Sequence, residues 1–253
     1  MKVDLNCDMG EGFGPWRMGD DAAMLAIVTS ANIACGWHAG DPDIMVRTAE
    51  LAREKGVAIG AHPGFGDLWG FGRRQIRGDS PAAIERMIAY QIGAMQACAS
   101  LAGHQVTYVK VHGALNNMAN EDEDLASALA RAVKGVDRSL VHVCMPGLAM
   151  ERASEREGVT VAREVFADRT YGDNGNLTTR RTPGAVLHDP EAAAARMVRW
   201  IQEGIVETTS GRRIQAAIDT ICVHGDEPTA VAMARAVRAA LEENGVTIAP
   251  FAR

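Results

Sequence analysis

Acidic and imidazole side chains follow strand-like runs of this chain at five places. Four apolar runs end in a histidine that lies near a glycine, and a fifth run ends in two carboxylates. Parallel strands bring their carboxyl ends to one edge of a sheet, and α/β enzymes keep their catalytic groups at that edge. Such groups can exchange protons with a substrate. The pattern therefore predicts an enzyme whose site contains Asp8, Glu11, His38, His62, His112 and His224.

Lys110 shares a strand face with one of these histidines. It alternates with Val109 and Val111, so its side chain points to the same face as His112. If that face looks into a barrel, Lys110 needs an acidic partner, because lysine is almost never buried unpaired. The alternative is that Lys110 reaches the rim and donates to loop carbonyls. We expect the buried pair.

Two long irregular stretches, 62–79 and 167–188, are rich in glycine, arginine, aspartate and threonine. Loops of this length are usually functional. The first contains GFGDLWGFGRR and ends in Arg73 and Arg74, which together can bind a carboxylate or phosphate. The alternative is a surface loop with solvated arginines. We favour a role in substrate binding, because the loop directly follows His62 at a strand end.

A second group of charged residues belongs to the strand expected at 160–166. Glu164 lies within this strand, and Asp168 and Arg169 come directly after it. Asp168 and Arg169 are candidates for substrate binding, and an internal ion pair that holds the loop is an open alternative. Asp226, after the last expected strand, is open between a site residue and a helix cap.

Strand-like and helix-like segments alternate from one end of the chain to the other. Three helical patterns begin with Asp or Ser followed by proline, which is typical of a capped helix start. Seven βα units without a linker-like segment predict one parallel sheet. Functional residues follow at least six strands, which favours a closed barrel over an open, doubly wound sheet. We expect helices to begin at Pro42, Pro81, Pro190 and about 228, and strands at 3–7, 30–35, 57–61, 107–111, 140–144, 160–166 and 220–224.

Composition fits a single domain over residues 1–253. The chain is 47% apolar and 23% charged, so it can bury a large core, and α/β barrels of this length are commonly one domain. The net charge is −6 and there is no basic run, which argues against nucleic acid and against an anionic membrane surface as partners. No apolar stretch approaches the roughly 18–20 residues that cross a bilayer.

The five cysteines indicate neither a disulfide framework nor a thiolate metal site. Their number is odd, and no two of them have the CxxC spacing that thiolate zinc sites commonly use. Four of them fall in predicted strands, where a thiol usually behaves as a small buried hydrophobe. The N-terminal segment enters a strand that contains acids, unlike a signal peptide. The sequence therefore favours a reduced, cytoplasmic location.

Five motifs resemble the LamB/YcsF family over residues 3 to about 245. They are DLNCDMGEGFG, SANIACGWHAGDP, IGAHPGFGDLWGFGRR, EVFADRTY and ICVHGD. The resemblance implies a seven-stranded parallel βα barrel of the glycoside hydrolase/deacetylase type. It also implies ATP-dependent cleavage of 5-oxoproline to L-glutamate together with partner subunits B and C. The chain differs from the residues usual in the family at Trp37, Val111 and Asn116.

The implied reaction needs activation, because a five-membered lactam is resonance-stabilised and its leaving amine stays tethered. Phosphorylating the lactam oxygen gives an imidate that water can attack, with a base for the water and an acid for the ring nitrogen. Either acid suits the base, and the histidines suit the proton shuttle. The catalytic candidates are Asp8, Glu11, His38, His62 and His112. The substrate-binding candidates are Arg73, Arg74, Lys110, Asp168, Arg169 and His224.

Cofactors and alternatives also follow from the residues. The chain has no GxxxxGK[ST] loop, so Mg-ATP is expected as a co-substrate bound with or by the partner subunits, without a tightly bound cofactor. The main alternative is a metal-dependent deacetylase-like hydrolase in which Asp8, His38 and His62 bind a divalent cation. It ranks second, because the HxxxH pair usual in that superfamily is missing. A non-enzymatic scaffold ranks third, since it would not need so many ionisable groups at one rim.

Overall fold

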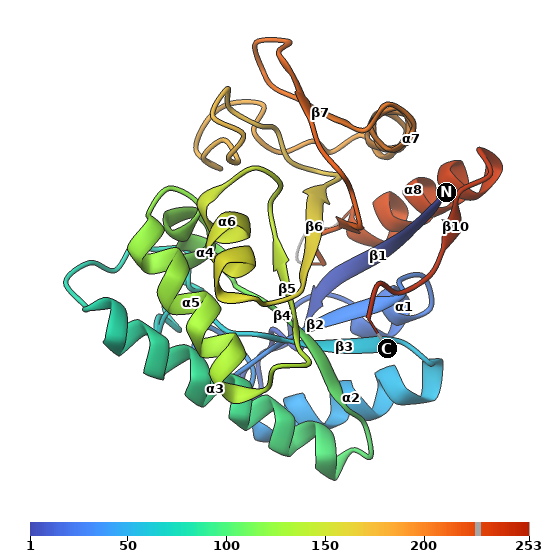
Figure 1. The fold of residues 1–253 in the computed structure, drawn as a ribbon. Helices are drawn as coiled ribbons and strands as arrows, with labels where there is room; N and C mark the ends of the chain where they lie inside the picture. The colour runs from blue at the N-terminus through green and yellow to red at the C-terminus, as the bar shows by residue number, and fades with distance from the viewer. Residues whose placement is uncertain (226–228, 253) are drawn as a thin grey trace.

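Seven parallel strands close into a barrel in the computed structural model, which describes residues 1–225 and 229–252 (Figure 1). The strand order is β1-β2-β3-β4-β5-β6-β9, and β9 pairs with β1 to close the ring. The predicted seven-stranded parallel barrel is therefore confirmed. Asp226 lies outside the described residues. The barrel strands are β1 (Lys2–Met9), β2 (Ser30–Ala34), β3 (Ala58–His62), β4 (Val106–Lys110), β5 (Val141–Cys144), β6 (Val161–Phe166) and β9 (Thr220–Cys222).

Helices surround the barrel, and their starts follow the capping signals of the sequence (Figure 1). The Asp41 carboxylate accepts a hydrogen bond from the Ile44 amide at 2.9 Å, which caps α2. Ser80 and Asp189 cap α3 and α7 in the same way, as predicted. The helices are α1 (Asp21–Leu25), α2 (Pro42–Lys55), α3 (Pro81–Leu101), α4 (Gly113–Ala119), α5 (Glu123–Val136), α6 (Ala149–Glu157), α7 (Pro190–Glu203) and α8 (Ala230–Glu243).

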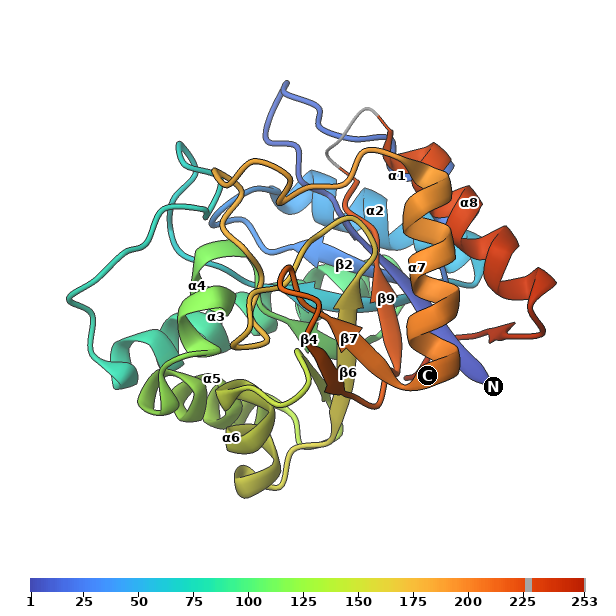
Figure 2. The ribbon, with the colours of Figure 1, turned by 90° about the horizontal axis from the view of Figure 1, so that it is seen from above.

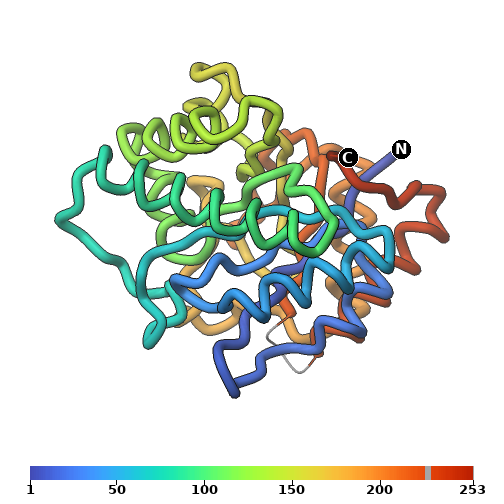
Figure 3. Tube along the Cα trace, turned by 90° about the horizontal axis from the view of Figure 1, so that it is seen from below, coloured from blue at the N-terminus to red at the C-terminus, as the bar shows by residue number. Residues whose placement is uncertain are grey.

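Three short strands lie outside the barrel and were not predicted. β7 (Ile205–Glu207) and β8 (Arg213–Gln215) form an antiparallel hairpin between α7 and β9. β10 (Thr247–Ile248) pairs in parallel with the start of β1, so the C-terminal segment lies beside the first strand (Figure 3). Strands of two or three residues are too short to produce a hydrophobic period, which explains why the sequence did not reveal them.

The interior of the barrel is polar. The side chains of β1 alternate: odd-numbered residues belong to the hydrophobic core under the helices, whereas Asn6 and Asp8 face inward. Tyr108 also points inward, and its hydroxyl donates to Asn32 Oδ1 at 2.8 Å. Gly60 leaves room for this ring, because a Cβ atom at that position would lie 2.1 Å from it. Hydrogen-bonded side chains thus support the mouth of the barrel from below.

The loops that follow β1, β3 and β6 reach out from the same side of the barrel, at the carboxyl ends of the strands (Figure 2). They span 10–20, 63–80 and 167–189, and they include both stretches expected to be functional. This side is called the mouth of the barrel. Among the described residues no helix has the length and apolar character needed to cross a membrane.

Candidate active site

Acidic and imidazole residues from four different strand ends meet at the mouth of the barrel, as predicted. Glu11 Oε1 lies 3.3 Å from His38 Nε2 and 3.5 Å from His112 Nδ1. His62 Nε2 lies 3.0 Å from His112 Nδ1 and 3.3 Å from Asp8 Oδ2. All five side chains are buried. The term mouth cluster is used for Glu11, His38, His62 and His112.

Backbone carbonyls fix one hydrogen on each of two imidazoles in the mouth cluster. His62 Nδ1 lies 2.7 Å from the Lys110 carbonyl oxygen, and His112 Nε2 lies 2.8 Å from the Phe71 carbonyl oxygen. Because a carbonyl oxygen only accepts, both nitrogens carry a hydrogen. In neutral rings the facing atoms, His62 Nε2 and His112 Nδ1, are therefore both lone-pair nitrogens. At 3.0 Å they need a shared proton or another cation between them.

His38 packs between the glycine-rich loop and His112. The two rings are stacked, with centroids 3.7 Å apart and planes 5° apart. Burial, followed by the charge of His62, lowers the pKa of His38 well below its usual value, so the neutral ring is favoured. A Cβ atom at Gly72 would lie 2.9 Å from His38 Cβ and 2.8 Å from His112 Cδ2. Gly72 thus allows the loop backbone to approach both imidazoles, a role that the sequence did not indicate.

Lys110 points into the barrel and pairs with two carboxylates beneath the mouth cluster. Its Nζ atom lies 2.9 Å from Asp8 Oδ1, 3.0 Å from Glu164 Oε1 and 2.9 Å from Cys222 Sγ. Burial opposes the charge, but the surrounding groups, Asp8 foremost, raise the pKa of the ammonium group well above its usual value. The expected buried lysine with acidic partners is confirmed. Direct binding of substrate by Lys110 stays a prediction.

Asp8 is held in its ionised form from two sides. Burial alone would raise its pKa, but the charges of His62 and Lys110 lower it well below the usual value. Asn32 Nδ2 also donates to Asp8 Oδ1 at 2.8 Å. A carboxylate with a depressed pKa is a weak proton acceptor. The environment of Asp8 therefore suits the orientation of His62 better than the removal of a proton from water.

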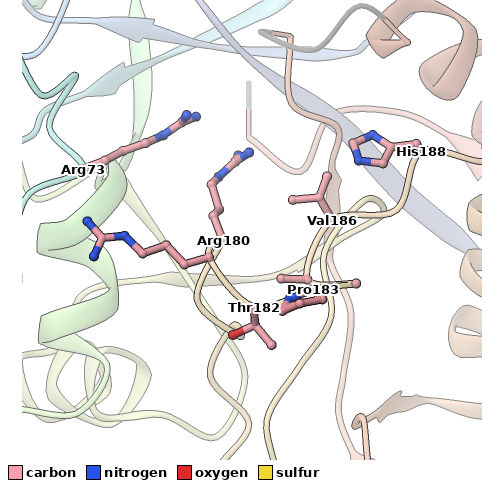
Figure 4. A pocket seen from close by; sticks show the side chains of 9 residues that line it. Arg73, Arg180, Thr182, Pro183, Val186 and His188 are labelled. Carbon is pink, nitrogen blue, oxygen red and sulfur yellow. The ribbon is translucent and has the colours of Figure 1, made fainter.

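A cavity lined by basic residues opens beside the mouth cluster. Its volume is about 520 Å³, and Arg73 and His188 lie on opposite sides of it in the view of Figure 4. Arg180 and Arg181 were not among the expected site residues. The available signal was the TTRRTPG segment of the 167–188 loop, which places two adjacent arginines among turn-forming residues. The remaining lining residues are Thr182, Pro183, Gly184, Ala185 and Val186.

The two arginines of the glycine-rich loop have different surroundings. Arg73 lines the cavity, and its guanidinium lies 4.9 Å from the centroid of the Phe71 ring, whose residue also accepts from His112. Arg74 instead forms an ion pair with Asp67 within the loop, and 67% of its side chain is exposed. The structure brings Arg73 to the site and uses Arg74 to hold the loop together.

Asp168 and His224 form an ion pair at the ends of β6 and β9. His224 Nδ1 lies 2.7 Å and 2.9 Å from the two carboxylate oxygens of Asp168. Arg169 donates to the carbonyl oxygens of Thr178 at 2.5 Å and Ala185 at 3.3 Å. Arg169 thus holds the loop, as one of the open interpretations proposed, but through backbone carbonyls and not through Asp168. Contact of any of the three with substrate stays a prediction.

Comparisons with known proteins place this barrel in a family. The profile of the LamB/YcsF family matches residues 3–253. The 5-oxoprolinase A subunit of Rhodopseudomonas palustris (strain BisB5) is 59% identical over 253 residues, which is 100% of both chains. The crystal structure of the lactam utilization protein from Thermus thermophilus is similar with a TM-score of 0.93 at 43% identity, covering 99% of this chain and 100% of that chain. T48 deacetylase, at 13% identity and a TM-score of 0.50 over 98% of this chain and 86% of its own, shares the fold alone. The chain belongs to the LamB/YcsF family.

Proposed function

We propose that this chain opens the lactam ring of 5-oxoproline to give L-glutamate in an ATP-dependent reaction. The observation that carries the proposal is the meeting of the mouth cluster and a cavity lined by Arg73 and Arg180 at one end of the barrel. 5-Oxoproline has a cyclic amide and a carboxylate, so its opening needs a water-activating group beside a cationic one. The names of the similar proteins, a 5-oxoprolinase component and a lactam utilization protein, support this substrate.

Within this proposal the mouth cluster activates the attacking water and moves protons. Glu11 is better placed than Asp8 as the base, because its carboxylate contacts two imidazoles, whereas Asp8 is held by Lys110. The His62–His112 contact provides a path for a proton toward the ring nitrogen, which must become the amine of glutamate. Asp8 keeps His62 oriented from the side opposite its carbonyl contact.

The carboxylate of 5-oxoproline is proposed to bind in the cavity. Guanidinium groups bind carboxylates with two parallel hydrogen bonds, and Arg73 links the cavity wall to the mouth cluster. A carboxylate held there would leave the lactam group of so small a molecule within reach of the imidazoles. Lys110 is less suited to this contact, because only 5% of its side chain is exposed.

ATP and the partner subunits B and C belong to the same proposal. The similar proteins carry the name of a single lettered subunit of 5-oxoprolinase, which is that of one part of an assembly. The sequence has no GxxxxGK[ST] loop, so Mg-ATP is proposed to bind with or by B and C, which would activate the lactam oxygen by phosphorylation. This dependence on ATP, together with five free cysteines, supports a cytoplasmic site of action.

Reconstitution tests the proposal. The purified full chain with 5-oxoproline and Mg-ATP should release little or no glutamate, and addition of subunits B and C should restore release. Full turnover by the chain alone would contradict the assigned dependence on partners. Glutamate release from 5-oxoproline by B and C without this chain would contradict its assignment as the ring-opening component.

A further inference from the structure

We propose that the mouth cluster is a binding site for one divalent transition-metal cation. This inference deepens the proposed function, because it assigns an agent that activates water at the same site. The donor atoms of the four residues all lie within 4.8 Å of one another, and none of the side chains is more than 5% exposed. Three imidazole nitrogens and one carboxylate oxygen are a donor set typical of zinc and related metals.

The spacing of the donors matches a coordination polyhedron. A tetrahedral site with metal–ligand distances of about 2.0–2.1 Å has edges of about 3.3 Å. The His38 Nε2–Glu11 Oε1 distance is 3.3 Å, and the His112 Nδ1–Glu11 Oε1 distance is 3.5 Å. The His62 Nε2–His112 Nδ1 distance is 3.0 Å. Three measured edges therefore agree with a tetrahedral site to within a few tenths of an ångström.

The far nitrogens of the imidazoles support the same assignment. Metal-binding histidines usually donate their other N–H group to a carboxylate or backbone carbonyl, which fixes the tautomer and orients the ring. His62 and His112 both do so, through the carbonyls of Lys110 and Phe71. Their facing lone pairs cannot bond to each other, but both can bind one cation. The alternative, a shared proton, would place a second positive charge close to the Lys110 ammonium group.

Asp8 is a poor member of this site, although the sequence suggested it as a possible ligand with His38 and His62. Its Oδ1 atom already accepts from Lys110 at 2.9 Å and from Asn32 at 2.8 Å. A cation at Asp8 would therefore lie next to an ammonium group, whereas Glu11 offers a carboxylate to two imidazoles. When bound, the cation would supply Lewis-acid chemistry and lower the pKa of a coordinated water.

Metal binding to the full chain, without substrate or partner subunits, tests the site. The protein is prepared without a histidine tag, treated with EDTA, desalted and titrated with Zn²⁺ or Co²⁺. We expect one equivalent of bound zinc by elemental analysis and the visible absorption of tetrahedral Co²⁺. Glu11→Gln and His112→Asn should each weaken zinc binding by at least about a hundredfold. His104→Asn, which changes a histidine at the far end of β4, should bind as wild type does.

Several outcomes would overturn the site. No stoichiometric binding above that of a histidine-free control protein would leave the shared proton, and the general-base route expected from the sequence, as the explanation of the geometry. Binding that survives both variants but is lost in Cys222→Ser would place the metal at the second group, Asp8, Cys222 and His224. Circular dichroism confirms that each variant is folded. Since no substrate is used, a failure of the 5-oxoprolinase assignment leaves this result readable.

Discussion

Replacing Lys110 by methionine should destabilise the fold far more than loss of one surface ion pair. The ammonium group is buried and lies 2.9 Å and 3.0 Å from the carboxylates of Asp8 and Glu164. Removing one partner of a buried pair typically costs about 3–5 kcal/mol, because the remaining charge stays buried without compensation. The free energy of unfolding, measured by urea denaturation at pH 7 with EDTA present, should fall by about this amount.

A second substitution separates buried charge from lost packing. Glu164→Gln in the Lys110→Met background removes one of the two uncompensated carboxylates while keeping its shape. The double variant should therefore be more stable than the sum of the two single changes predicts, with a coupling of about 1–3 kcal/mol, as for residues in direct contact. Additive effects, or a cost of the Lys110→Met change below about 1 kcal/mol, would refute the ion-pair account.

Three further predictions concern other parts of the molecule. Burial lowers the pKa of His142 to about 4, so stability is lost as the pH falls from about 6.5 to 4; urea denaturation should show a loss of about 3 kcal/mol that is absent in His142→Leu. Arg73→Ala should raise the KM for 5-oxoproline in the reconstituted complex about tenfold or more, whereas Arg74→Ala should change it little. Gly72→Ala should crowd the imidazoles and lower kcat by roughly tenfold to a hundredfold; Gly78→Ala, also at positive φ but with open space around it, should retain activity.

Much of the fold was predictable, because its signals are local. The Asp–Pro and Ser–Pro pairs fix the starts of α2, α3 and α7 through hydrogen bonds to nearby amides. The histidines at strand ends were predictable for a topological reason: a closed parallel barrel brings all such ends to one rim. The convergence of His38, His62 and His112 follows from this topology alone.

The partners of the site residues were not predictable in the same way. Whether Asp168 would pair with Arg169 or with His224 depends on the approach of β6 to β9, which are 54 residues apart at their nearest ends. The hydrogens on the imidazoles depend on which carbonyls lie behind them, and the Phe71 carbonyl comes from a loop without a hydrophobic period. Arg180 reaches the cavity through the path of a long loop, which the sequence marks as functional without giving its course.

The central claim is that the mouth cluster opens the lactam ring, and Glu11→Gln tests it most directly. This change keeps the shape of the side chain and removes the carboxylate that both a general base and a metal ligand require. The initial rate of glutamate formation from 5-oxoproline and Mg-ATP is measured with the variant chain, subunits B and C, and the exposed Glu50→Gln change as the matched control. We expect a rate at least about a hundredfold below wild type for Glu11→Gln and an unchanged rate for the control. A folded Glu11→Gln chain that turns over within about threefold of wild type, well short of such a loss, would contradict the account.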